Sequence, residues 1–146
     1  MKQKTFCAVI LSILLGIGAT SCSKDNESAD HARTIAGTYK GVLHIANMPD
    51  VENVTIEIIR DGVNQVTLKM NETVLTLPIN ISCESIVLYN DQDISGVTTY
   101  NMVTEAGTVP VPVTIKGTIK SGTASLTIQV AIPNLPVEVL FDGKKQ

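Results

Sequence analysis

The chain has 146 residues, of which 44% are hydrophobic and 17% charged, and its formal net charge is −3 at neutral pH. This length suits one domain with its own core, and the acidic balance lacks the clustered positive charge of a nucleic-acid-binding protein. Aromatic residues make up 3% of the chain and tryptophan is absent, which argues against the stacking platforms of single-stranded nucleic-acid sites.

The first 21 residues have the pattern of an export signal. Lys2 and Lys4 give the start a positive charge, and the segment Phe6–Ile17 is apolar except for Ser12. A run of about a dozen apolar residues is too short for a transmembrane helix, which needs about 20, but it suits the core of a cleaved secretory signal. We therefore expect residues 1–21 to be a signal peptide.

The residues Ala19-Thr20-Ser21-Cys22 resemble the lipobox of bacterial lipoproteins. The resemblance implies that Cys22 becomes the acylated first residue of the mature protein and attaches it to a membrane, durably if two or three chains are added. Loss of Lys2 and Lys4 takes the formal charge from −3 to −5. Ala19 stands where lipoboxes most often have Leu. Ordinary secretory cleavage after Ala19 or Ser21, without an anchor, is the alternative.

Residues 22–34 are expected to form a flexible tether. The segment Ser23–Asp30 is polar, and such a segment buries too little apolar surface to fold by itself. Acidic residues just after the cysteine also resemble the surface-export signal of lipoproteins in certain Gram-negative gut anaerobes. We therefore expect an outer membrane lipoprotein, with display on the cell surface as a further hypothesis.

Residues 35–146 have the pattern of an all-β domain. Apolar and polar residues alternate, with turn residues about every eight to twelve positions. In the first half, strands are expected over Tyr39–Ile45, Val54–Ile58, Gln65–Met70 and Leu75–Ile81, with turns at Asn47–Asp50, Arg60–Gly62 and Asn71–Glu72. In the second half, strands are expected over Ser85–Asn90, Ile94–Val103, Val113–Lys120, Ala124–Ile132 and Val137–Phe141.

Eight or nine consecutive strands with short links suggest an up-and-down meander. We expect an eight-stranded antiparallel β-barrel, because closure of the sheet removes its exposed edges. Pro110 and Pro112 lie in the segment Val109–Pro112. Since proline cannot donate to a strand ladder, we expect the weakest seam of the barrel at this segment.

Both ends of the domain carry a family resemblance. Ile35–Gly41 opens it, and Ile115–Ile119, Ser121-Gly122, Ala124–Ile132 and Val137–Phe141 close it. These segments resemble the calycin-like (lipocalin-like) β-barrel domains of lipoproteins from the same bacteria, over Ala36 to about Gly143. The resemblance implies an eight-stranded antiparallel barrel of largely uncharacterised function. Gly37-Thr38-Tyr39 stands where true lipocalins have Gly-x-Trp.

The period-two pattern also indicates which residues should face the barrel lumen. They are Tyr39, Leu43, Val54, Ile56, Ile58, Val66, Leu68, Met70, Leu75, Leu77 and Ile79. A barrel of eight strands is just wide enough to be filled by side chains or to hold one small ligand. One hypothesis is therefore a lipoprotein that binds a small apolar or amphipathic molecule. The alternative is an interaction module of a cell-envelope complex with a filled barrel and no ligand.

The sequence indicates no enzyme. Nucleophile-elbow and triad patterns are absent, and no pair of carboxylates stands out. Asp91–Gly96 begins like a calcium loop, but Met102 stands where such a loop needs a bidentate Glu. We therefore expect a solvated turn there, and no metal or other cofactor. Cys83 shares its strand face with Ile79 and Ile81, so we expect a buried thiol rather than a nucleophile.

Overall fold

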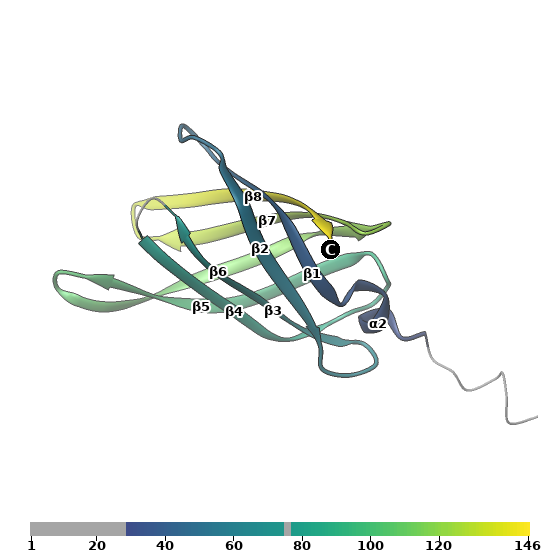
Figure 1. Cartoon of the computed structure of the whole chain (residues 1–146). Helices are drawn as coiled ribbons and strands as arrows, with labels where there is room; N and C mark the ends of the chain where they lie inside the picture. Colours follow the sequence, from purple (N-terminus) through teal and green to yellow (C-terminus); the bar gives the residue numbers. More distant parts are fainter. Residues whose placement is uncertain (1–28, 75–76) are drawn as a thin grey trace, which may run out of the picture.

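The computed structural model describes residues 29–74 and 77–146, which form one eight-stranded antiparallel sheet curled into a nearly closed barrel (Figure 1). The strands are β1 (Gly37–Ile45), β2 (Val51–Arg60), β3 (Gln65–Val74), β4 (Leu77–Val87), β5 (Asp93–Thr104), β6 (Gly107–Lys120), β7 (Thr123–Ile132) and β8 (Leu135–Lys145). Each strand pairs with the next one in sequence except β4, which does not pair with β5, and β1 also pairs with β8. The strand order is β4-β3-β2-β1-β8-β7-β6-β5. The expected all-β, eight-stranded antiparallel fold is confirmed.

Several strand boundaries differ from the prediction, and two of the differences have a clear local cause. Asn71–Glu72, expected as a turn, lies inside β3, where Asn71 pairs with Asn80 of β4. The Glu72 carboxylate also accepts a hydrogen bond from the Thr55 backbone N–H at 2.7 Å, which links this part of β3 to β2.

The expected strand over Ser85–Asn90 is instead the last part of β4 and the link that follows it. Ser85 has a φ of +57°, and the pairing of β3 with β4 shifts between Val66 and Leu68. This irregularity acts as a β-bulge. The extra residue reverses which positions of β4 face inward. Cys83 and Ile86, which regular alternation would place on opposite faces, are therefore both buried.

The prediction of the weakest seam at Val109–Pro112 is wrong. Pro110 pairs with Asn101 and Pro112 with Thr99 in the β5–β6 hairpin. The β6–β7 pairing begins only at Val113, so these prolines lie where β6 has a partner on one side, a position that tolerates a missing N–H. The open seam lies instead between β4 and β5, the two ends of the strand order.

A short helix, α2 (His31–Ile35), covers one end of the barrel beside the start of β1 (Figure 1). Ala32 and Ile35 are buried, and the Tyr39 hydroxyl donates a 2.7 Å hydrogen bond to the Ile35 carbonyl. Residues 31–34, expected as part of the tether, therefore belong to the barrel domain, because the helix buries apolar side chains that an isolated segment could not. Residues 1–28, with the expected signal peptide and Cys22, lie outside the described part.

The start of α2 is held by charged groups. The Asp30 carboxylate caps the helix by accepting from the Arg33 N–H at 2.9 Å, and it pairs with Arg60 of β2 at 2.7 Å. These hydrogen bonds, with that from Arg60 as the largest effect, lower the pKa of the Asp30 carboxyl. Within residues 29–74 and 77–146, no helix is both long and apolar enough to cross a membrane.

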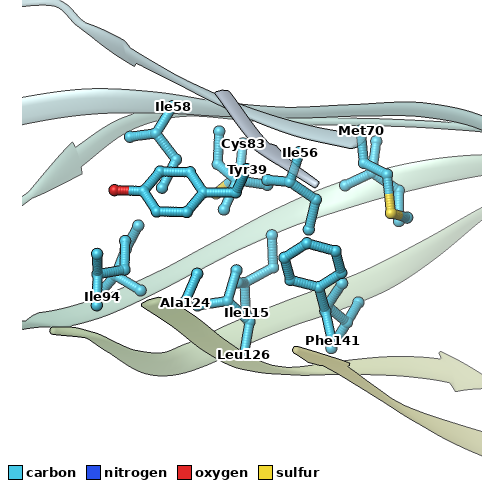
Figure 2. Close-up of a cluster of buried hydrophobic side chains, with 14 of the residues drawn as sticks. Tyr39, Ile56, Ile58, Met70, Cys83, Ile94, Ile115, Ala124, Leu126 and Phe141 are labelled. Carbon is cyan, nitrogen blue, oxygen red and sulfur yellow. The ribbon is translucent and has the colours of Figure 1, made fainter. Parts of the chain in front are cut away.

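The half of the barrel next to α2 is filled by side chains. The rings of Tyr39 and Phe141 project into the interior between the walls, among Ile56, Ile115 and their neighbours (Figure 2). Both rings are fully buried. The barrel therefore has a solid core at the α2 end, and free space can remain only toward the other end.

Candidate functional site

A cavity of about 410 Å³ lies at the end of the barrel opposite α2. It lies beside the four turns that join β1 to β2, β3 to β4, β5 to β6 and β7 to β8. Its lining residues are Leu43, Ile45, Met48, Met70, Val74, Pro78, Ile79, Ile81, Tyr100, Met102, Val103, Ile128, Val130, Ile132, Val137 and Val139. This volume lies within the range of small-molecule sites, roughly 300–1,000 Å³.

The lining forms because the alternation of the strands continues to their ends. Ile128, Val130 and Ile132 follow one another at every second position of β7, and Val137 and Val139 do so in β8. Large aromatic rings fill the lumen nearer α2, but aliphatic side chains of moderate length line this half and leave its centre open.

The cavity is almost uniformly apolar. Among the described residues that line it, Tyr100 alone carries a polar side-chain group, a hydroxyl that donates to the Pro78 carbonyl at 3.3 Å. None of the lining residues in the described part of the chain is charged, and burying an unpaired charge in such surroundings is costly. The site therefore suits an uncharged apolar group, with any strongly polar part of a ligand left at the mouth.

The rim of the mouth is apolar as well. Met48 and Val103 line the cavity and remain 49% and 81% exposed, and Leu135, in the strand after the β7–β8 turn, is 64% exposed. An apolar molecule that entered the cavity would meet apolar side chains before reaching the interior.

The predicted lumen residues divide between the core and the cavity. Leu43, Met70 and Ile79 line the cavity. The others that the structure describes are buried and do not line it: Tyr39, Val54, Ile56, Ile58, Val66 and Leu68. Leu75 and the side chain of Leu77 lie outside the described part, as does Cys22.

The sequence reasoning missed the part of the lining that comes from the second half of the chain. The signal was present, because Ile128, Val130 and Ile132 have the same period-two spacing as the residues chosen in β2 and β3. Met48 lies in a turn and Pro78 breaks the pattern, so alternation could not have identified either of them.

A larger hollow of about 500 Å³ lies on the outside of β1 and β8. Lys40, Glu52, Asp142 and Lys144 are among the residues that line it, so it is a shallow charged surface rather than an enclosed site. His44 on the same face lies 2.9 Å from an Asp50 carboxylate oxygen. Among residues 29–74 and 77–146, no three His, Cys, Asp or Glu side chains are grouped so as to hold a metal ion.

Cys83 is buried and free, as expected. Burial raises the pKa of its thiol, which keeps the group protonated at neutral pH. A reactive cysteine needs the thiolate form, so this side chain acts as a small apolar group of the core.

The chain is similar to a crystal structure of a "putative outer membrane protein" from Bacteroides fragilis. The TM-score is 0.56 at 14% sequence identity, over 82% of this chain and 54% of the other. The shared property is the fold. The chain spans about half the length of that protein. No family model matches the sequence, and no curated protein does either.

Proposed function

We propose that this protein is a bacterial envelope lipoprotein whose barrel binds a small, uncharged apolar or amphipathic molecule. The observation that carries the proposal is the cavity of about 410 Å³ with an aliphatic lining. Transfer of apolar surface from water into such a site is favourable by about 25 cal/mol per Å². Because the described lining residues carry no charge, a bound molecule must keep its charged or strongly polar part outside.

We further propose that the barrel is of the calycin-like type. The meander order, the pairing of β1 with β8, the small helix over one end and the cavity at the other support this assignment. The outward residues include Lys40, Glu57 and Lys69, which are exposed. A polar outside around an apolar inside is the opposite of the arrangement of a barrel that faces lipid.

The binding proposal is tested with the mature chain carrying Cys22→Ser, which cannot be acylated and needs no detergent. Val130→Phe places a ring in the cavity, and Val97→Phe places the same ring on the exposed face of β5, where Val97 is 70% exposed. We expect N-phenyl-1-naphthylamine to fluoresce with the parent chain and with Val97→Phe, and at least tenfold weaker binding to Val130→Phe, a loss of roughly 1.4 kcal/mol. Equal binding to both variants would contradict the proposal.

Anchoring is supported by the lipobox resemblance at Ala19–Cys22 and by the similarity in fold to the outer membrane protein of Bacteroides fragilis. The expected result is an acyl mass on an N-terminal Cys22 in mass spectrometry of the protein from bacterial membranes. Cys22→Ala should abolish it, whereas Cys83→Ala should leave it unchanged. A mature N-terminus without acyl mass contradicts the lipoprotein proposal but leaves the binding proposal intact.

The second candidate function is an interaction module of a cell-envelope complex. It is favoured by Val63, Val87 and Tyr89, which are 44%, 52% and 89% exposed at the α2 end of the barrel. The turn before β3 and the link after β4 meet there, since the Leu88 N–H donates to the Asn64 carbonyl at 2.8 Å. Loss of a cross-linked envelope partner in Tyr89→Ser, with probe binding unchanged, would support this function.

A further inference from the structure

One wall of the barrel is held together differently from the others. No backbone hydrogen bond joins β4 to β5 among the described residues, although every other neighbouring pair around the barrel shares a ladder. We call this junction the β4–β5 seam. Two hydroxyl groups of β5 cross it: Thr98 Oγ1 donates to the Ser82 carbonyl at 2.7 Å, and the Tyr100 hydroxyl donates to the Pro78 carbonyl at 3.3 Å.

The seam is closely packed toward the α2 end. A methyl group placed on Gly96 would lie 2.7 Å from Cys83 Sγ and 2.9 Å from a side-chain carbon of Ile86. Only a residue without a side chain lets β5 approach β4 so closely. The contact here is side-chain packing among buried groups.

Toward the mouth of the cavity, fewer interactions hold β4 and β5 together. Pro78 lies on the β4 edge and has no N–H to donate. The Tyr100 hydrogen bond there is long and exposed to solvent. Strand edges joined by two side-chain hydrogen bonds separate more easily than edges joined by a continuous ladder, because fewer bonds must break.

This weak part of the seam is also a wall of the cavity. Pro78 and Ile79 from β4, and Tyr100 and Met102 from β5, all line it. Tyr100 belongs both to the cavity wall and to the seam, since it lines the cavity and its hydroxyl donates a hydrogen bond across the seam. A ligand that pushes against this wall therefore pushes directly on the contact that closes it.

We propose that the β4–β5 seam is an adjustable wall of the binding cavity, and that Tyr100 sets the selectivity between narrow and wide apolar ligands. This inference rests on the proposed binding function. A straight alkyl chain fits the cavity with the seam closed. An uncharged molecule with fused or branched rings enters when the strands part near the mouth, which breaks the Tyr100 and Thr98 hydrogen bonds.

The test compares a narrow with a wide probe on the mature chain carrying Cys22→Ser. Thr98→Val and Tyr100→Phe, singly and together, remove the two hydroxyls and keep the size and shape of the side chains. We expect the double variant to shift the ratio of Kd values about fivefold in favour of N-phenyl-1-naphthylamine over 1-decanol, the effect of about one hydrogen bond. Thr104→Val is the matched control, because Thr104 Oγ1 donates to the Gly107 carbonyl at 2.8 Å in the same strand but at the β5–β6 turn.

Amide hydrogen exchange without ligand gives an independent measurement. Exchange in residues 78–86 and 94–104 should be faster in the double variant, and exchange in β1 and β8 should be unchanged. Faster exchange in every strand indicates global destabilisation and overturns the inference. If both probes bind the parent chain and the ratio does not shift, the adjustable wall is overturned and ligand binding stands. If neither probe binds the parent chain, both proposals fail.

Discussion

Ser82 illustrates how a single polar atom affects the barrel. Its Oγ is buried and has no hydrogen-bond partner in the described part of the chain, while its carbonyl accepts the bond from Thr98. A buried hydroxyl without a partner costs about 1–3 kcal/mol. Ser82→Ala removes that atom and keeps the backbone carbonyl. We expect this variant to be more stable by about 1 kcal/mol, seen as a higher urea midpoint with an unchanged slope.

Ser125→Ala is the matched control for Ser82→Ala. Ser125 Oγ donates to an Asp142 carboxylate oxygen at 2.7 Å on the outer face. Its removal therefore deletes a satisfied hydroxyl and should not raise the midpoint. A destabilised Ser82→Ala would show that the hydroxyl has a partner, such as an ordered water.

The glycines of β1 and β8 allow the two strands to meet behind the aromatic rings. Gly41 pairs with Gly143, and a methyl group on Gly41 would collide with the backbone of Asp142 and Gly143. Because backbone cannot move aside as a flexible side chain does, Gly41→Ala should destabilise the protein by roughly 3 kcal/mol, at the upper end of overpacking effects. Thermal unfolding measures this change.

Gly62→Ala controls for the change in residue type. A methyl group on Gly62 would lie 3.7 Å from the Gln65 Cβ, an ordinary contact. We expect a change in stability below about 1 kcal/mol for this surface turn. Similar losses in Gly41→Ala and Gly62→Ala would contradict the steric argument.

At the scale of elements, α2 depends on Tyr39. The hydroxyl donates to the Ile35 carbonyl, and burial raises the pKa of the phenol. As the pH rises through about 10, tyrosine ionises first in the unfolded chain. The unfolded state then binds fewer protons than the native state, so the free energy of unfolding falls.

Tyr39→Phe should therefore have two effects. At neutral pH it costs about 1 kcal/mol, because the hydrogen bond to Ile35 is lost. Between about pH 9 and 11 its stability should fall less than that of the wild type, with a remaining decline from Cys83, whose pKa is also raised by burial. Urea unfolding at several pH values measures both. Tyr89→Phe, at an 89% exposed position, should keep the wild-type profile.

The strands show what the alternation of the sequence can and cannot predict. In β2, Val54, Ile56 and Ile58 are buried and the residues between them are not. The alternation within this one segment is therefore enough to predict which of its side chains face the core. The end of β3 was missed because Asn71 is held by its partner Asn80. Cross-strand pairing is a property of two segments, and the pattern of one segment does not contain it.

The same reason explains why the cavity was predicted only in part. The parity of Leu43, Met70 and Ile79 indicated that they face inward, and they do line the cavity. Whether inward residues fill the lumen or line a space depends on where the rings of Tyr39 and Phe141 end. The bulge at Ser85 and the unpaired β4–β5 seam are likewise results of closing the sheet.

For the whole molecule, the cavity and the first described residues lie at opposite ends of the barrel. The described chain begins beside α2, and the cavity opens at the other end of the barrel. Asp30 is eight positions after Cys22, a reach of about 27 Å at full extension. Strands of 10 to 14 residues such as β2 and β6, tilted as in barrels, give a height of about 25–35 Å. The reach of the tether is therefore about equal to the height of the barrel, and the tether would have to be fully extended before the mouth could touch the membrane. We expect an acylated Cys22 to hold the mouth away from its own membrane.

Fluorescence quenching on vesicles checks this orientation. A fluorophore is attached through Ser121→Cys, in the β6–β7 turn at the α2 end, or through Asn134→Cys, in the β7–β8 turn at the mouth. Both residues have positive φ and lie in two-residue turns, so the two labels have similar local surroundings. With acylated protein and a lipid-borne quencher, we expect stronger quenching at position 121. Stronger quenching at position 134 would mean that the mouth faces the bilayer, and ligands would then exchange with the membrane rather than with the aqueous phase.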